Sequence, residues 1–346
     1  MRPVALTWLA AGTLGIGLWG AGCAEVLKLD EFAGGTSTSA GGTGGAGGSA
    51  VGGQGGLGGN GGTAGGGGSG AGAGGGVVHA CNLDAPFEGL APVAELNSPV
   101  VERSVFLSPD QKVVYFSSNR ISGFPAGDEL WWASRSSITE SFSGLAKLLN
   151  VNAPQDEFFP SVTADGKTLI FASTRPLSAL TDLYIATRDD AAMDFGVPAV
   201  IAGLNTSDHD FGPHVLPDRS ALYFYSGQGD EYDIYRAGAS NGTFVNPEPV
   251  TEVNAEGEID GCPVPTPDEL TLYFFTMREG GAPDIWVAHR EHASQPFDPP
   301  TKVEELCSDA QDRPGWIAPD GCTIYFMTDR DSDPNQLDIW RAQRPP

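Results

Sequence analysis

The chain has 346 residues and is strongly acidic, with 44 Asp and Glu against 19 Lys and Arg and a formal net charge of −25 at pH 7. Such a surface repels phosphate backbones and anionic lipid headgroups. The composition therefore argues against nucleic acid as a partner and against electrostatic docking on a membrane. The 48 glycines, many of them in one stretch, indicate a low-complexity segment beside a folded part.

Residues 1–22 have the pattern of an export signal. Arg2 precedes an apolar run over residues 4–19, and small residues follow before Cys23. A run of this kind is short for a membrane span and is removed from the mature chain. Residues 20–23, Gly-Ala-Gly-Cys, resemble a bacterial lipobox, although Gly stands where Leu is typical, and Ala24 follows the cysteine. The resemblance implies a lipid on Cys23 and sorting to the outer membrane of a Gram-negative bacterium; the alternative is a plain secretory signal.

Residues 23–80 are predicted to be the lipidated N-terminus and a disordered linker. From residue 34 to residue 76 the sequence is almost entirely Gly with Ala, Ser and Thr. A segment without side chains to bury cannot offset its ordering entropy, so it is predicted to be a flexible tether. It has no G-X-Y register and no proline, which excludes a collagen helix.

Residues 81–346 contain five copies of one pattern. Each copy has a tight turn around an aspartate, a β-branched and aromatic run, a variable loop, and a further run that begins with an acid. In the second copy these read TADGKTLIFASTR (163–175) and DLYIATR (182–188). An element of the form F-x-x-P that ends near an Asn supplies a fourth strand. The turn aspartates recur every 50 to 55 residues, at Asp110, Asp165, Asp218, Asp268 and Asp320.

Four short strands in a repeat of about 50 residues are typical of a propeller blade. The fifth copy ends at Arg344 with three strands, and an orphan fourth-strand element, FEGLAPVAELN (87–97), precedes the first copy. The sequence therefore predicts an all-β, five-bladed β-propeller of four-stranded blades. The N-terminal strand would complete the last blade, so that no sheet edge stays open.

The pattern P-x-x-[ST]-x-D-G-K-T-[LI]-x-F-x-S-x-R followed by D-[LI]-Y resembles the TolB-type, WD-like "PD" propeller repeat of bacterial envelope proteins. The resemblance covers residues 87–346. It implies a location in the periplasm or at the cell surface, and an envelope protein or a cell-wall polysaccharide as partner. It also implies contact with the membrane only through the N-terminal lipid. We expect a monomer.

Four cysteines besides Cys23 favour disulfides in an exported chain. The strand assignment puts Cys81 and Cys322 on one face of the last blade, and Cys262 and Cys307 on the opposite face of the fourth blade. We predict these two pairs, of which the first would lock ring closure and contribute about 2 to 5 kcal/mol. The alternative is free thiols.

An acid precedes every turn aspartate by eight residues. If the strand before the turn is innermost, these five carboxylates lie at one mouth of the axial channel. Hard cations take oxygen ligands, so the ring could bind Ca²⁺ or a basic group. The alternative is that each acid caps the loop between blades and serves the repeat. The five acids are Glu102, Glu157, Asp210, Asp260 and Asp312.

An arginine follows four of the turns by ten residues, with Gln228 in the third copy. We predict exposed ion pairs, worth about 0 to 1 kcal/mol each, with the acids that open the next strand. The arginines are Arg120, Arg175, Arg278 and Arg330, and the acids are Glu129, Asp182, Asp284 and Asp338.

The sequence contains no G-x-S-x-G elbow, no H-E-x-x-H and no phosphate loop. We therefore expect a non-enzymatic protein without a cofactor that binds its ligand at the axial mouth, with loops 121–128 and 331–337 contributing specificity. One alternative is a five-bladed glycoside hydrolase with two carboxylates at the mouth as acid and base. Another is a propeller with a purely structural Ca²⁺ site.

Overall fold

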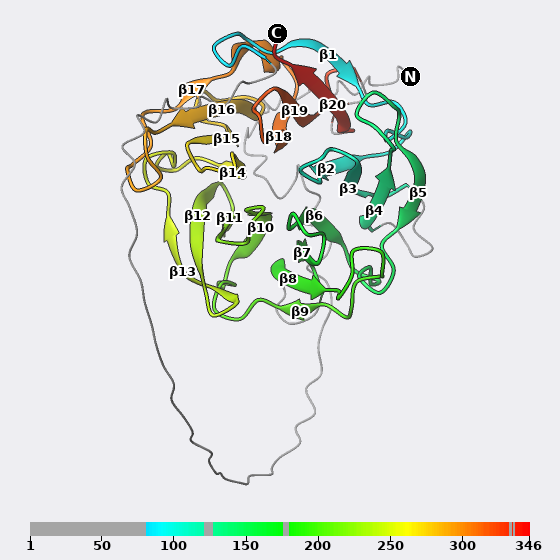
Figure 1. Ribbon diagram of the computed structural model, residues 1–346. Helices are drawn as coiled ribbons and strands as arrows, with labels where there is room; N and C mark the ends of the chain where they lie inside the picture. The colour runs from blue at the N-terminus through cyan, green and yellow to red at the C-terminus, as the bar shows by residue number, and fades with distance from the viewer. Residues whose placement is uncertain (1–80, 121–126, 176–179, 332–333, 335) are drawn as a thin grey trace, which may run out of the picture.

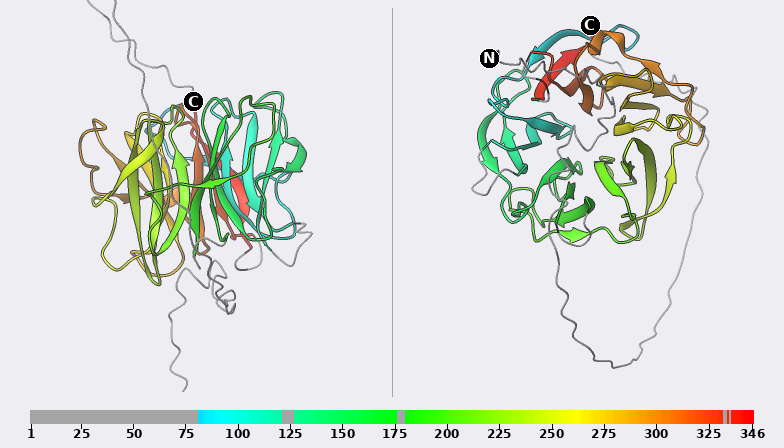
Figure 2. Two further views of the ribbon diagram at one scale, coloured as in Figure 1. Left: turned by 90° about the horizontal axis from the view of Figure 1, so that it is seen from below. Right: turned by 180° about the vertical axis from the view of Figure 1, so that it is seen from behind.

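The computed structural model describes residues 81–120, 127–175, 180–331, 334 and 336–346. The predicted signal peptide, the lipidation site Cys23 and the linker lie outside these residues. The described part is all-β: five sheets of four antiparallel strands surround a common axis (Figure 1), and the edge-on view shows strands running between two faces (Figure 2). The predicted fold is confirmed. No described helix has the length and apolar character needed to cross a membrane.

The blades follow one another along the chain. Blade 1 contains β2 (Glu102–Leu107), β3 (Val113–Ser118), β4 (Glu129–Ser134) and β5 (Ser143–Lys147). Blade 2 contains β6 (Glu157–Val162), β7 (Thr168–Ser173), β8 (Asp182–Thr187) and β9 (Ala199–Val200). Blade 3 contains β10 (His209–Val215), β11 (Ala221–Gln228), β12 (Glu231–Ser240) and β13 (Thr243–Pro249). Blade 4 contains β14 (Asp260–Pro265), β15 (Thr271–Thr276), β16 (Asp284–His289) and β17 (Thr301–Lys302), and the short 3-10 helix η2 (Glu304–Leu306) follows.

Blade 5 closes the ring with strands from both ends of the chain. It contains β18 (Asp312–Ile317), β19 (Thr323–Thr328), β20 (Asp338–Gln343) and β1 (Glu88–Pro92). Strand β1 pairs with β20 in an antiparallel register that sets Glu88 opposite Gln343 and Pro92 opposite Trp340. This pairing completes the last sheet with a fourth strand and so closes the ring, as predicted.

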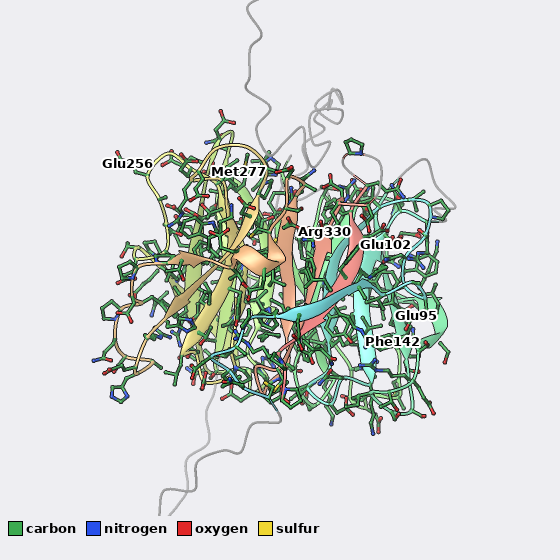
Figure 3. The ribbon with its side chains drawn as sticks, turned by 90° about the horizontal axis from the view of Figure 1, so that it is seen from above. Glu95, Glu102, Phe142, Glu256, Met277 and Arg330 are labelled. Carbon is green, nitrogen blue, oxygen red and sulfur yellow. A yellow bond between two sulfur atoms is a disulfide. The ribbon has the colours of Figure 1, made fainter. Side chains whose placement is uncertain are left out.

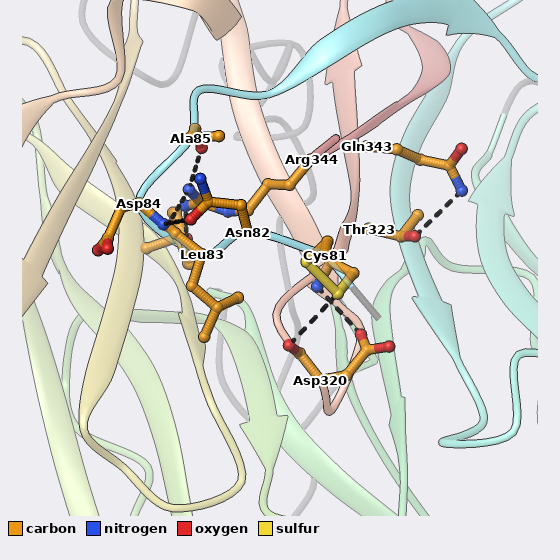
Figure 4. The surroundings of a disulfide bond; sticks show 11 residues. Cys81, Asn82, Leu83, Asp84, Ala85, Asp320, Thr323, Gln343 and Arg344 are labelled. Carbon is orange, nitrogen blue, oxygen red and sulfur yellow. Dashed lines mark hydrogen bonds between the residues drawn. A yellow bond between two sulfur atoms is a disulfide. The ribbon is translucent and has the colours of Figure 1, made fainter. Parts of the chain in front are cut away.

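The predicted disulfide Cys81–Cys322 is present, with a Cα–Cα distance of 5.7 Å. It fastens the segment before β1 to the turn between β18 and β19 (Figure 4). Beside it, the Asn82 amide donates to the Pro345 carbonyl at 2.8 Å. The two ends of the chain are therefore joined by a covalent bond, a strand pair and a backbone hydrogen bond.

The predicted pair Cys262–Cys307 is wrong, because the two cysteines lie at different radii of blade 4. Cys262 belongs to β14, the innermost strand, whereas the Cys307 thiol donates to the Ile285 carbonyl in β16 at 3.5 Å. Two strand spacings separate β14 from β16, about 9 to 10 Å, beyond the Cα distance that a disulfide spans. Burial raises the pKa of Cys307 to about 12, so this thiol stays protonated at neutral pH.

Cys307 occupies the repeat position that an asparagine holds in the other blades. In those blades the asparagine side chain makes two hydrogen bonds with one residue of the third strand: its NH₂ group donates to the backbone carbonyl, and its oxygen accepts from the backbone amide. The two bonds tie the loop between blades to the sheet. The pairs are Asn152 with Leu130, Asn205 with Leu183, Asn254 with Ile234 and Asn97 with Ile339.

The core lies between neighbouring blades, where the second strands present a recurrent phenylalanine. These rings are at most 1% exposed, and they are Phe116, Phe171, Phe224, Phe274 and Phe326. Each innermost strand is kinked by a β-bulge, seen as a register shift against the second strand. At one bulge Gly212 has φ +55°, and a Cβ there would lie 2.5 Å from the Tyr225 ring. The strands meet so closely at the axis that a cavity of about 30 Å³ remains, lined by all five blades.

Candidate functional site

The five recurrent acids each lie at the start of an innermost strand, and each is 0% exposed. We call the face at this end of the strands the mouth face and the opposite one the turn face; in Figure 3 Met277, Arg330 and Glu102 lie nearer the mouth face than Phe142. Glu102 accepts hydrogen bonds from the Ser98 amide and hydroxyl at 3.2 and 2.7 Å, and from Ser118 at 2.9 Å. It thereby holds the loop that enters the blade.

The recurrent arginines bond to these acids, not to the third-strand acids, so that prediction is wrong. The distances are 2.7 Å for Arg120–Glu102, 3.0 Å for Arg175–Glu157, 2.9 Å for Arg278–Asp260 and 2.6 Å for Arg330–Asp312. Of the predicted third-strand partners, Glu129 bonds to Lys147 and Asp284 to Lys302. In blade 3, where Gln228 replaces the arginine, the Thr206 amide donates to Asp210 at 2.8 Å.

Burial raises the pKa of three of the ring acids. It raises the pKa of Glu157 to about 7 and that of Asp210 to about 6, and it also raises the pKa of Glu102. Among the described residues, no group of three or more His, Cys, Asp and Glu side chains is arranged to hold a metal ion. The bonds of the ring acids to their own entry loops and arginines favour the structural interpretation of the ring, in which each acid serves its own blade.

The positions next to the ring acids differ from blade to blade. The residues before the acids are Val101, Asp156, His209, Ile259 and Gln311. The residues after them are Arg103, Phe158, Phe211, Gly261 and Arg313. Because a scaffold position recurs in every blade, polar residues that do not recur in every blade are candidates for ligand contact. We define the mouth cluster as the polar residues among these together with two bonded neighbours: Arg103, Asp128, Asp156, His209, Gln311, Arg313 and Asp329.

In blades 1 and 2 the mouth cluster forms a chain of bonds. Arg103 Nε lies 2.6 Å from Asp128 Oδ2, with both side chains buried. The Asp128 amide donates to Asp156 Oδ1 at 2.7 Å, and the Asp156 amide donates to Thr174 at 3.1 Å. Burial, together with the nearby Asp128 charge, raises the pKa of Asp156 to about 6. This carboxyl group therefore gains and loses a proton near neutral pH.

Blades 5 and 3 contribute the remaining members of the mouth cluster, of which Gln311, Arg313 and Asp329 are buried and His209 is partly exposed. The Arg313 guanidinium donates to Gln311 Oε1 at 2.7 Å and stacks over the Phe275 ring at 5.2 Å. The backbone amide of Gln311 donates to Asp329 Oδ1 at 2.8 Å. His209 Nδ1 accepts from the Thr181 amide at 3.2 Å. Burial lowers the pKa of His209, so the imidazole is neutral at pH 7.

Blade 4 differs from the other blades at the mouth face. Ile259 precedes its ring acid where blade 5 has Gln311, and Met277 stands where blade 5 has Asp329. The mouth thus has a polar arc over blades 5, 1, 2 and 3 and an apolar arc on blade 4. Of the mouth cluster, only Asp128 belongs to a segment predicted to contribute specificity, the loop 121–128. The signal that could have found the others is the departure from the repeat beside each ring acid. Of the predicted specificity loops 121–128 and 331–337, residues 121–126, 332, 333 and 335 lie outside the described residues.

A second set of arginines, at the end of the third strands, was also missed and joins neighbouring blades. Each guanidinium stacks over the phenylalanine that precedes a fourth strand, at 4.0 to 4.3 Å, and reaches the tyrosine hydroxyl of an adjacent blade. The Arg–Tyr pairs are Arg135–Tyr325, Arg188–Tyr115, Arg290–Tyr223 and Arg344–Tyr273. Their recurrence indicates a scaffold role.

A scan against protein-family models and a search of curated proteins find no match. Among solved structures, putative TolB from Agrobacterium tumefaciens is similar at 14% identity and a TM-score of 0.44, over 74% of this chain and 97% of that one. TolB from Acinetobacter baumannii is similar at 15% identity and a TM-score of 0.40. The match covers 71% of this chain and 56% of that one. The catalytic domain of the Coprinopsis cinerea GH62 α-L-arabinofuranosidase is similar at 11% identity and a TM-score of 0.48. The match covers 75% of this chain and 97% of that one.

The solved structures that resemble this chain include more than one kind of protein. TolB propellers are among them, as the repeat pattern predicts, and glycoside hydrolase propellers are as well. At such identities and TM-scores the likeness shows no more than the propeller architecture, which hosts unrelated activities. Function has to be argued from the site.

Proposed function

We propose that this chain is a non-enzymatic binding protein of the bacterial cell envelope, and that the mouth face of its propeller binds an envelope protein or a cell-wall ligand. One observation carries the proposal: the recurrent acids are engaged by the scaffold, while polar residues that do not recur in every blade gather around the mouth, where Asp156 and His209 are partly exposed. A rigid ring that presents unlike side chains at one face is suited to recognition. The apolar arc at Ile259 and Met277 adds the apolar contact that binding sites combine with polar groups.

Two features support an envelope location. The N-terminal pattern favours export and a lipid on Cys23, followed by a glycine-rich tether that would hold the propeller near a membrane. The disulfide between Cys81 and Cys322 fits an oxidising compartment outside the cytosol. We propose outer-membrane anchoring, with the propeller facing the periplasm or the cell surface.

The test is capture from envelope extract with three forms of the full-length protein: the wild type, a mouth variant and a control. The mouth variant combines Asp156→Asn with His209→Gln, which preserve side-chain size and leave the ring acids intact. The control is Val197→Ser, at a residue that is 87% exposed. A partner retained by the wild type and the control but lost by the mouth variant is expected. Equal retention by all three folded proteins would refute binding at the mouth.

A glycoside hydrolase is the second candidate, and the pair Asp156 and Asp128 favours it. Burial raises the pKa of Asp156 to about 6, as a general acid requires, while Arg103 pairs with Asp128 at 2.6 Å. Release of reducing sugar from arabinan or xylan by the wild type, abolished by Asp156→Asn, would support the enzyme. No release from either polymer would leave the binding function as the better account.

A further inference from the structure

We propose that the cleft between blades 1 and 2 on the turn face is a docking site for a peptide segment of a partner protein, one that carries large apolar side chains flanked by basic residues. The cleft encloses about 530 Å³, within the size range of ligand pockets, roughly 300 to 1,000 Å³. It lies at the end of the blades opposite the mouth cluster, and the inference does not rest on the proposed function of the mouth.

The walls of the cleft are aromatic and aliphatic. Tyr115 and Trp132 come from neighbouring strands of blade 1, where they are paired in the β3–β4 ladder, and Phe195 comes from blade 2. At the rim Leu149 is 61% exposed and Met193 is 58% exposed. Large apolar side chains exposed beside an apolar cavity mark an interaction site, and a flexible methionine adapts to the shape of its partner.

The repeat supplies an internal comparison, because a corresponding cleft lies between blades 3 and 4. There Arg236 stands opposite Tyr223 in the ladder, as Trp132 stands opposite Tyr115 in blade 1. Glu269 follows its turn aspartate, as Gly166 does in blade 2, and it forms an ion pair with Arg236 at 2.6 Å. That cleft is therefore charged.

An indole and a glycine replace this ion pair between blades 1 and 2, which gives that cleft an apolar wall. The cleft between blades 5 and 1 is charged as well, since Arg135, Glu140 and Arg341 line it. The apolar character is thus a property of one cleft of the three and does not follow from the fold.

Two carboxylates at the rim favour basic flanks in the occupant. Asp110 and Asp165 line the cleft. The Ser108 hydroxyl donates to Asp110 Oδ1 and the Thr163 hydroxyl donates to Asp165 Oδ1, both at 2.6 Å. The bond from Thr163 lowers the pKa of Asp165, which therefore stays ionised. The guanidinium of Arg188 is engaged by Gly166, Met193 and Tyr115 and stacks on Phe195 at 4.0 Å. The net charge of −25 adds long-range attraction for a basic segment.

The probe is a fluorescein-labelled peptide, acetyl-Lys-Lys-Phe-Leu-Lys-Lys-amide, titrated with the full-length protein and followed by fluorescence anisotropy. Two analogues separate the contributions: one has Ser-Ser in place of Phe-Leu, and one has Gln in place of every Lys. We expect saturable binding of the probe and at least tenfold weaker binding of each analogue.

Protein variants localise the binding. Leu149→Ser with Met193→Ser, at exposed positions that leave the core intact, should weaken binding of the probe tenfold or more, and so should Trp132→Arg, which installs the residue of blade 3. Val197→Ser and Asp156→Asn should bind as the wild type does, which distinguishes this cleft from the mouth. The proposal is overturned if the probe fails to bind, if the Ser-Ser analogue binds equally well, or if the cleft variants bind unchanged.

Discussion

The disulfide between Cys81 and Cys322 should be the strongest single constraint on ring closure. The two cysteines are 241 residues apart in sequence, so the bond encloses nearly the whole propeller. In the chain-entropy model the stabilisation grows with the logarithm of loop length, and a loop of about 240 residues corresponds to roughly 5 kcal/mol. Measured effects of native disulfides are usually about 2 to 5 kcal/mol. We expect Cys81→Ser with Cys322→Ser to lower the free energy of unfolding by about 3 to 5 kcal/mol.

The assay is equilibrium unfolding in urea, followed by tryptophan fluorescence, for the wild type and the double variant. The variant should still fold, because the β1–β20 pairing persists and Arg344 still stacks over Phe87 at 4.2 Å. Wild-type protein in reductant should match the variant, and the variant should not respond to reductant. A loss below about 1 kcal/mol would refute the reasoning and show that strand pairing alone closes the ring.

Three further outcomes follow from the site. Glu157→Gln removes the charge that Arg175 contacts at 3.0 Å. Because burial already keeps part of this carboxyl group protonated near neutral pH, the substitution should cost about 1 to 3 kcal/mol of stability in urea; a loss of capture without a loss of stability would contradict the scaffold role. Burial raises the pKa of Asp156 to about 6 and that of Glu157 to about 7, so the folded state binds more protons than the unfolded state. The contribution of these two groups to the free energy of unfolding is therefore fully present below about pH 4 and is lost as the pH rises towards 7. Urea midpoints should therefore fall less over that range in Asp156→Asn than in the wild type, and equal slopes would refute the assignment. Chelation by EDTA should leave the melting temperature unchanged; a decrease reversed by Ca²⁺ would restore the structural-calcium alternative.

The fold could be predicted because its determinants are local and repeated. Turn chemistry, the alternation within short strands and a spacing of 50 to 55 residues give five equivalent blades. The last copy of the repeat has only three strands, so residues 87–97 are needed as its fourth strand to close the ring. The pairing of Cys81 with Cys322 follows from that closure. The second pairing failed because it matched the two cysteines by face alone. Cys262 lies in the innermost strand of blade 4, whereas Cys307 lies beside Ile285 of the third strand.

The partner of the recurrent arginines could not be chosen from sequence, since two acids are equally near. In blade 1 the ladder sets Ser118 opposite Glu102 on one side and opposite Glu129 on the other, and Arg120 follows Ser118 by two residues. Burial decides between them. Glu102 is fully enclosed and requires a compensating charge, whereas Lys147 already bonds to Glu129 at 2.5 Å.

Blade 1 departs from the repeat at both of its ends, and this connects the two candidate sites. At the mouth face it carries the Arg103–Asp128 ion pair, and at the turn face it carries Trp132 where blade 3 has Arg236. Because the ring acids and the phenylalanines recur in every blade and the arginines recur in four of the five, such replacements change surface chemistry without changing the frame. A chain that separates its scaffold from its surface in this way can carry two independent binding faces. Variants at Asp156 and at Leu149 should therefore affect different ligands and combine additively.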